Sequence, residues 1–254
     1  GAPDTSPPTL RWNRGRGGIP SPAAGVTRIM IQLSLSVVAF LVFSLALFVW
    51  RARPESKINC SFAAFTVFVA LWVIGVAAFQ SGALLDFWAR YTFAAASFLP
   101  ATFLTFARHY PTRSRWPTRL ILALNYFIAS FFAGLALFTG SIVSRTTLAS
   151  SGPTRELGPL YPFFAVYFLV AWTSAFVVFT AKWRRTRGLA RIQLHYLAIG
   201  FLVGSAGGIS MNLLVPLFTG SVVYSWIGPH FALAFVALVA HAIIRHRLMD
   251  LRLV

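Results

Sequence analysis

The sequence predicts an all-α integral membrane protein, a seven-transmembrane-helix bundle with its N-terminus outside and its C-terminus in the cytoplasm. Three observations lead to this fold class. Of the 254 residues, 57% are hydrophobic and only 11% are charged, whereas a soluble domain carries roughly 25% charged residues. Seven apolar runs follow one another, each near or above the roughly 20 residues that a helix needs to cross about 30 Å of hydrocarbon. Lysine and arginine gather in alternate loops, which sets the orientation.

The first 29 residues are rich in Pro, Gly, Ser and Arg and show no hydrophobic periodicity, which predicts a disordered basic tail over residues 1–29. Met30 opens the first apolar run, so one hypothesis takes Met30 as the natural start. The other hypothesis takes the tail as native. The tail cations lie on the outer side in the predicted topology, against the positive-inside rule, which is the reason to question the tail.

The seven runs and their short loops define one membrane domain, residues 30–254. In chain order the runs are Met30–Trp50, Ile58–Gln80, Leu84–Ala107, Arg119–Thr139, Leu160–Lys182, Ile192–Phe218 and Trp226–Ile244. Only the outer loop Ser141–Pro159 has any length. The alternating segments of about 10 residues that build a membrane β-barrel are not seen in the sequence.

The distribution of cations places the C-terminus in the cytoplasm. The outer loops hold only Arg145 and Arg155. A net charge of +17 would indicate a nucleic-acid partner in a soluble protein. Here the cations lie at the ends of apolar runs, so we expect a lipid bilayer as the partner and no nucleic acid. The inner loops and the C-terminal exit hold Arg51, Arg53, Lys57, Arg108, Arg113, Arg115, Arg119, Lys182, Arg184, Arg185, Arg187, Arg191, Arg245, Arg247 and Arg252.

Four polar residues near the outer ends of the predicted helices are candidates for ligand binding or sensing. Asp86 and Arg90 lie four residues apart in the third run, hence on one helical face. At a rise of about 1.5 Å per residue, Arg90 and Asn212 of the sixth run lie at similar depths. His230, at the start of the seventh run, could join them. One interpretation is an outward-facing polar pocket for a small ligand. The other is an ion pair between Asp86 and Arg90 that only ties helices together.

The sixth run carries the clearest packing pattern. Gly200, Gly204 and Gly208 recur every four residues, so they share one face that lets another backbone approach closely. We expect this face to pack against a neighbouring helix of the bundle rather than to form a dimer seam. Pro216 cannot donate a hydrogen bond to the carbonyl of Asn212, which predicts a kink at that point.

The sequence shows no signature of an enzyme. It contains no Gly-rich phosphate loop, no His/Cys cluster with metal-ligand spacing and no nucleophile elbow. We therefore expect no catalytic residues, no cofactor and no metal. Among the five acidic residues only Asp86 lies within a predicted span, whereas ion-coupled transporters usually bury more carboxylates.

Several segments resemble the N-terminal seven-transmembrane input region of bacterial sensor histidine kinases. The likeness runs from Met30 to Val254 and rests on the order and spacing of its motifs. These are Ser61-Phe62-Ala63 with Leu71-Trp72, Trp88-Ala89-Arg90-Tyr91, Phe98-Leu99-Pro100, Phe106-Ala107-Arg108 with Tyr110-Pro111, Arg191-Ile192-Gln193-Leu194-His195-Tyr196 with Gly200, Asn212-Leu213-Leu214-Val215-Pro216, Gly228-Pro229, and Arg245-His246-Arg247-Leu248-Met249-Asp250.

The resemblance implies a sensory module in the bacterial cytoplasmic (inner) membrane. A stimulus would shift helices 6 and 7, and the exit that holds Arg245, Arg247 and Asp250 would carry the shift to an output region beyond Val254. In the family this region is commonly a dimeric histidine kinase that serves a cytoplasmic response regulator. The resemblance thus implies a homodimer in a two-component system, with the catalytic motifs of the kinase outside this chain.

Two other functions remain open at the level of sequence. One is a small-solute transporter or channel, in which the layer of Asp86 and Arg90 lines a path. The other is a structural or assembly protein of the membrane, in which the bundle only anchors or packs. The coding sequence after Val254 separates them, because a phospho-acceptor histidine and an ATP-binding region would identify the sensor.

Overall fold

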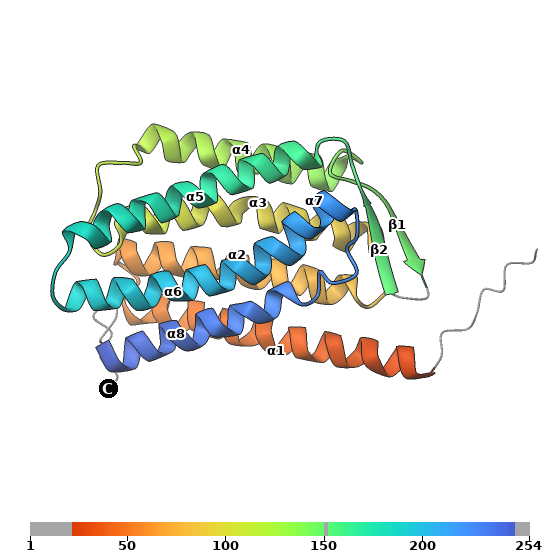
Figure 1. Ribbon diagram of the computed structural model, residues 1–254, viewed down its shortest axis with the longest axis horizontal. Coiled ribbons are helices and arrows are strands. Elements are labelled where there is room, and N and C mark those ends of the chain that lie inside the picture. The colour runs from red at the N-terminus through yellow and green to blue at the C-terminus, as the bar shows by residue number, and fades with distance from the viewer. Residues whose placement is uncertain (1–21, 150–151, 247–254) are drawn as a thin grey trace, which may run out of the picture.

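The computed structural model describes residues 22–149 and 152–246 and shows a bundle of long helices with one β-hairpin (Figure 1). A π-helical turn, Ser210–Leu214, joins α6 to α7, so Leu189–Thr219 forms one continuous helical segment. A short 3-10 turn, Gly228–His230, precedes α8. The helices are α1 (Pro22–Ala52), α2 (Lys57–Phe79), α3 (Leu85–His109), α4 (Arg119–Phe138), α5 (Tyr161–Arg185), α6 (Leu189–Ile209), α7 (Val215–Thr219) and α8 (Phe231–His246). The hairpin pairs β1 (Val143–Ala149) with β2 (Gly152–Leu157) in antiparallel fashion.

The helix boundaries follow local signals in the sequence. Ser56 and Thr118 precede α2 and α4, and each side chain accepts a hydrogen bond from a backbone N–H three residues on, as N-cap residues do. α1 begins at Pro22, so the helix includes eight residues that the sequence placed in the tail. Residues 1–21 lie outside the described part of the chain.

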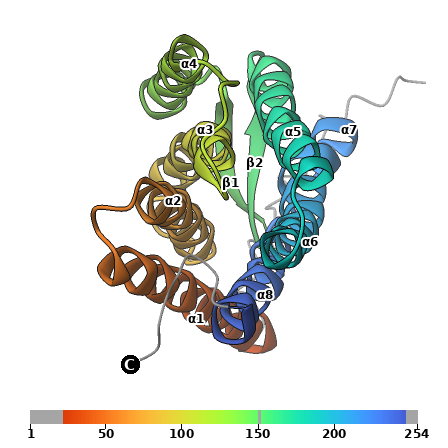
Figure 2. The same cartoon turned by 90° about the vertical axis from the view of Figure 1, so that its left-hand side faces the viewer.

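The helices form a ring when the bundle is viewed from its end (Figure 2). α2 packs on α3, α3 on α5, α5 on α6 and α6 on α8, and α1 closes the ring between α8 and α2. α4 lies outside the ring against α3. This arrangement makes α3 the most enclosed helix, since α2, α4 and α5 all pack against it.

The two ends of the bundle differ in character. The hairpin and the turns after α2 and α7 lie at one end, here called the hairpin end (Figure 1). The loops after α1, α3 and α5 lie at the other end, together with the end of α8. We call this the basic end because these loops carry most of the lysines and arginines between the helices.

The helices and their surface identify a multi-pass membrane protein. Five helices of the described part are long and apolar enough to cross a membrane: α1, α2, α4, α5 and the segment Leu189–Thr219. Large apolar side chains stand exposed on the outside of the bundle, among them Phe40, Phe127, Phe163, Val170 and Leu202. A water-exposed bundle would not carry so wide an apolar surface, whereas lipid favours it. The enclosed α3 is more polar than these five because its neighbours, rather than lipid, surround it.

Candidate functional site

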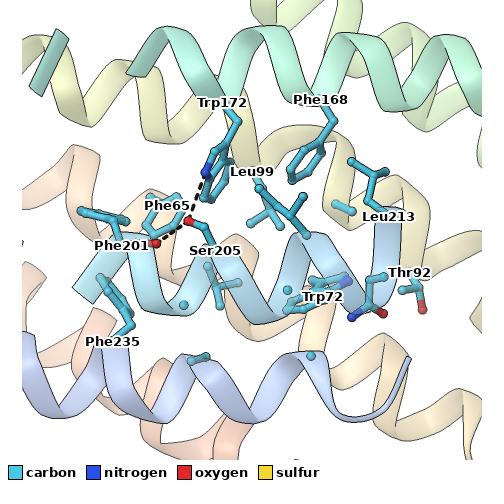
Figure 3. A pocket seen from close by; sticks show the side chains of 18 of the residues that line it. Phe65, Trp72, Thr92, Leu99, Phe168, Trp172, Phe201, Ser205, Leu213 and Phe235 are labelled. Atoms are coloured by element: carbon cyan, nitrogen blue, oxygen red, sulfur yellow. Dashed lines mark hydrogen bonds between the residues drawn. The ribbon is translucent and has the colours of Figure 1, made fainter. Parts of the chain in front are cut away.

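A cavity of about 90 Å³ lies inside the ring, between α2, α3, α5, α6 and α8 (Figure 3). Its walls are mainly apolar and aromatic, with Phe65 and Trp72 from α2, Phe168 and Trp172 from α5, and Phe201 from α6. A largely apolar pocket with a few polar groups is the usual form of a small-molecule site.

Glycines of α6 let α8 approach closely beside the cavity. A methyl group added at Gly200 or Gly204 would lie 3.4–3.5 Å from the side chain of Phe235 in α8. One added at Gly207 would overlap the ring of Phe231, the first residue of α8. Gly208 faces Trp72 of α2 instead. Beside the cavity, α6 and α8 therefore meet in a closely packed seam with glycines on the α6 side.

The π-helical turn forms the hairpin end of the same wall. Pro216 has no N–H to donate to the carbonyl of Asn212, and the N–H of Val215 bonds five residues back to Ser210. The hydroxyl of Tyr161, at the start of α5, donates to the carbonyl oxygen of Leu213 at 2.9 Å and lies 3.4 Å from that of Asn212. Tyr161 thus replaces a donor that the helix lacks at this point.

Ser205 and Trp172 form the polar contact in the middle of the cavity. The Trp172 Nε1–H donates to the hydroxyl oxygen of Ser205 at 3.1 Å, and this hydroxyl donates to the carbonyl oxygen of Phe201 (Figure 3). Both polar groups have hydrogen-bond partners within the protein, and their contact holds the Trp172 ring in its place in the cavity wall.

Arg155 closes the cavity from the hairpin end. In β2 the side chains of Pro153 and Arg155 turn inward, and Arg155 is only 4% exposed. The guanidinium carbon lies 4.8 Å from the ring centre of Phe93 and 5.4 Å from that of Phe79, in cation–π contact. Its Nε and Nη1 atoms are buried without a hydrogen-bond partner.

Burying the charge of Arg155 at this position costs free energy. Burial lowers its pKa to about 10, so the side chain is still a cation at neutral pH. An isolated buried charge costs several kcal/mol, and two cation–π contacts offset only about 1–2 kcal/mol each. Arg155 is therefore a cation beside an apolar cavity, and no side chain of the described residues forms an ion pair with it.

The sequence-predicted residues Asp86 and Arg90 lie outside this cavity. The Asp86 carboxylate accepts a hydrogen bond of 2.6 Å from the hydroxyl of Thr146 in β1, which ties α3 to the hairpin. Within residues 22–149 and 152–246, no ion pair joins Asp86 to Arg90, and the Nε of Arg90 is buried without a hydrogen-bond partner. The expected ion pair is thus replaced by a contact with the hairpin.

The other two candidates are also separated. Asn212 lies in the π-helical turn and lines the cavity, and both atoms of its side-chain amide are buried without a partner. His230 turns toward α1, where its Nε2 lies 3.0 Å from the hydroxyl of Ser34, and its Nδ1 lies 3.0 Å from the carbonyl oxygen of Trp226. The structure does not bring the four predicted residues into one pocket, and a role for each in sensing stays a prediction.

Only part of the predicted signal exit lies in the described residues. Arg245 belongs to the last turn of α8, and Arg247 and Asp250 lie outside the described residues. The sequence reasoning missed Arg155 as a site residue. The available signal was its position in an outer loop, where Arg145 is the only other cation.

The described residues contain no group of three or more His, Cys, Asp or Glu side chains arranged to hold a metal ion. A search of curated proteins finds no match to the chain. The family described as the N-terminal 7TM region of histidine kinase matches residues 34–252, which is most of the sequence. With a membrane bundle of apolar helices and a match over nearly its whole length, the chain belongs to the N-terminal 7TM region family of histidine kinases.

Proposed function

We propose that this chain is the sensory input module of a bacterial signal-transduction histidine kinase. It spans the cytoplasmic membrane seven times and relays a stimulus through the segment Leu189–Thr219 and α8 to an output region beyond Val254. The observation that carries the proposal is the shared wall of the cavity, because the seam between α6 and α8 is also the start of the path toward the C-terminus.

The distribution of charge supports an inward-facing basic end. The loops after α1, α3 and α5 are rich in arginine, and the end of α8 lies beside them (Figure 1). By the positive-inside rule this end faces the cytoplasm, and the hairpin end faces outward. The cavity then lies nearer the side from which an external stimulus arrives.

The relay needs an element with two discrete arrangements. The seam between α6 and α8 fits this requirement, since glycines offer little resistance to sliding and Phe231 and Phe235 lie directly against them. Toward the basic end the rings of Tyr196 in α6 and His241 in α8 lie 5.3 Å apart, which keeps the two helices in contact as far as the exit. A change in the cavity therefore has a direct route along both helices.

The packing below the cavity supports a sensor over a channel. The rings of Phe103 and Phe201 lie 4.3 Å apart between centres, and those of Phe62 and Phe106 lie 5.3 Å apart. Phe179 of α5 lies within 6 Å of the rings of Phe103, Phe106 and Phe201. These buried rings pack the interior of the bundle toward the basic end, where a channel would need an open path.

The output we propose is a homodimeric histidine kinase that phosphorylates a cytoplasmic response regulator. The first test is the coding sequence downstream of Val254. A phospho-acceptor histidine followed by an ATP-binding region supports the proposal, whereas a stop codon at that position removes it.

The seam itself is tested in the full-length protein, reconstituted in liposomes, by Gly207→Ala. The added methyl group must displace Phe231, so we expect the basal rate of autophosphorylation to change by about two- to thirtyfold, as a coupling energy of roughly 0.5–2 kcal/mol implies. Gly134→Ala in α4 is the matched control, because nothing lies within 4 Å of a methyl group added there.

Equal autophosphorylation rates in the two variants, with both folded and inserted, would contradict the relay through this seam. A change in the control as large as that in Gly207→Ala would do the same, since it would show that helix composition alone alters the rate.

A further inference from the structure

We propose that the central cavity binds a short-chain carboxylate of roughly three to six carbon atoms, with its anionic group at Arg155 and its chain among the aromatic side chains. Only the interpretation of this ligand as the stimulus rests on the proposed sensory function. The binding itself is a property of this chain.

The unpaired guanidinium of Arg155 defines the charge of the ligand. Its Nε and Nη1 atoms are donors without acceptors, and the side chain lines the cavity while being almost wholly buried. Arginine recognises carboxylates through charge-assisted hydrogen bonds. The acidic residue of the chain that lies nearest in sequence, Glu156, is exposed on the opposite face of β2, so an anion from outside the chain is the natural partner.

Asn212 supplies a second polar group on another wall of the same cavity. Its side-chain amide presents a donor and an acceptor, both buried and both without a partner. Buried amides are normally satisfied, and a native exception calls for an explanation. A carboxylate has oxygen atoms enough to accept from both Arg155 and the Asn212 amide.

The size of the cavity limits the rest of the ligand. In the measure by which one water occupies about 10–15 Å³, a cavity of about 90 Å³ has room for roughly six to nine water-sized groups, which suits the five to eight non-hydrogen atoms of propionate to hexanoate. A slim, short chain satisfies this limit and a two-tailed lipid does not. The aromatic walls formed by Phe65, Phe168 and Trp172 favour an apolar chain.

The hairpin gives the site an outer cover. Arg155 belongs to β2, and β1 is held to α3 by the hydrogen bond between Thr146 and Asp86. Most side chains of β1 are exposed. A ligand that enters from the hairpin end therefore meets Arg155 first and the aromatic walls second.

The test measures binding of hexanoate to the purified chain in nanodiscs of neutral phosphatidylcholine, by calorimetry. We expect Arg155→Met to weaken hexanoate binding by about ten- to hundredfold, as the loss of a hydrogen bond to a charged group implies. Arg145→Met is the matched control, since Arg145 is an exposed hairpin arginine, and we expect it to bind hexanoate as the wild type does. 1-Hexanol has the chain without the charge, so we expect the wild type and both variants to bind it with equal affinity.

The thermal stability of the unliganded protein separates ligand binding from a structural role. A cation that awaits an anion destabilises the empty protein, so Arg155→Met is expected to melt at the wild-type temperature or above it. A lower melting temperature in Arg155→Met, or unchanged hexanoate binding, would overturn the proposal. Arg155→Lys, which keeps the charge, is expected to retain part of the affinity.

A chain-length series completes the test. Affinity is expected to rise from propionate to hexanoate and to fall for decanoate, because the cavity is closed below by aromatic rings. Tightest binding by decanoate, or displacement of hexanoate by phosphatidylglycerol in the nanodisc, would contradict the short chain and assign the cavity to a membrane lipid. None of these measurements uses an output domain, so a failed ligand and a failed relay give different results.

Discussion

Tyr161 carries the hydrogen bond that the long helical segment cannot make for itself. Pro216 leaves the carbonyl of Asn212 without its usual helical donor, and the π-helical turn shifts the neighbouring hydrogen bonds by one residue. The Tyr161 hydroxyl reaches the carbonyls of Asn212 and Leu213 from the start of α5. A side chain in one helix therefore stabilises an irregularity in another.

We predict that Tyr161→Phe destabilises the protein by about 1–3 kcal/mol, because buried carbonyls lose their donor. The melting temperature in nanodiscs should fall by a few degrees. Tyr224→Phe is the control, since Tyr224 is 56% exposed and should melt as the wild type does. Equal melting temperatures for the two variants would show that another group satisfies these carbonyls.

Single residues also show where sequence reasoning ends. Asp86 and Arg90 share a helical face, which suggested an ion pair, but the sequence held no sign that a hairpin would bring Thr146 to Asp86. Arg155 looked like an ordinary loop residue. Its burial depends on the position of β2 across the end of the bundle, which only tertiary packing determines.

At the scale of elements, Lys182 joins α5 to the C-terminal end of α3. Its ammonium lies 2.7–2.9 Å from the carbonyl oxygens of Ala107, Arg108, Tyr110 and Thr112. Carbonyls at the end of a helix lack helical donors and carry partial negative charge, so a cation there is favourable. Lys182 thus closes the basic end of the enclosed helix.

We predict that Lys182→Met lowers the free energy of unfolding by about 1–3 kcal/mol, since several carbonyls lose one charged donor. Lys57→Met is the control, because Lys57 is an exposed cation at the same end of the bundle. Denaturant or thermal unfolding in nanodiscs measures both. An equal loss in the two variants would mean that the charge, rather than the carbonyl contacts, matters.

The sequence predicted most elements and missed one. Each of the seven apolar runs corresponds to helical structure. Run length and hydropathy are local properties of the sequence, and a lipid environment constrains both of them. The run Ile192–Phe218 is one continuous segment whose irregularity was predicted from Pro216 but not as a π-helical turn. The hairpin was read as the loop Ser141–Pro159, since its short polar strands lack the alternating hydrophobic pattern that marks a strand.

At the scale of the whole molecule, the proposed orientation follows from the difference between the ends. Nearly all loop cations lie at the basic end, and the hairpin end carries few. Moving that many arginines across a bilayer is unfavourable, so the basic end should stay in the cytoplasm.

We predict that reporter fusions after Arg115 and Arg187 are active only as cytoplasmic reporters, and that fusions after Gly82, Gly152 and Ser221 are active only outside. This alternation requires four crossings, one each by α3, α4, α5 and the segment Leu189–Thr219. Two successive fusions on the same side would overturn the count, and the opposite pattern throughout would overturn the orientation while keeping the count.

The enclosure of α3 has a consequence for how the protein is made. During synthesis α3 follows α2, and with Asp86 and Arg90 near its start it is a poor candidate for partitioning alone into lipid. Ser97 and Thr102 bond to carbonyls of their own helix, which removes part of that cost but not the charges. α2, which is strongly apolar and packs along α3, leaves the ribosome first and offers the surface that α3 needs. We therefore expect α2 and α3 to enter the bilayer as a pair, rather than each helix in turn.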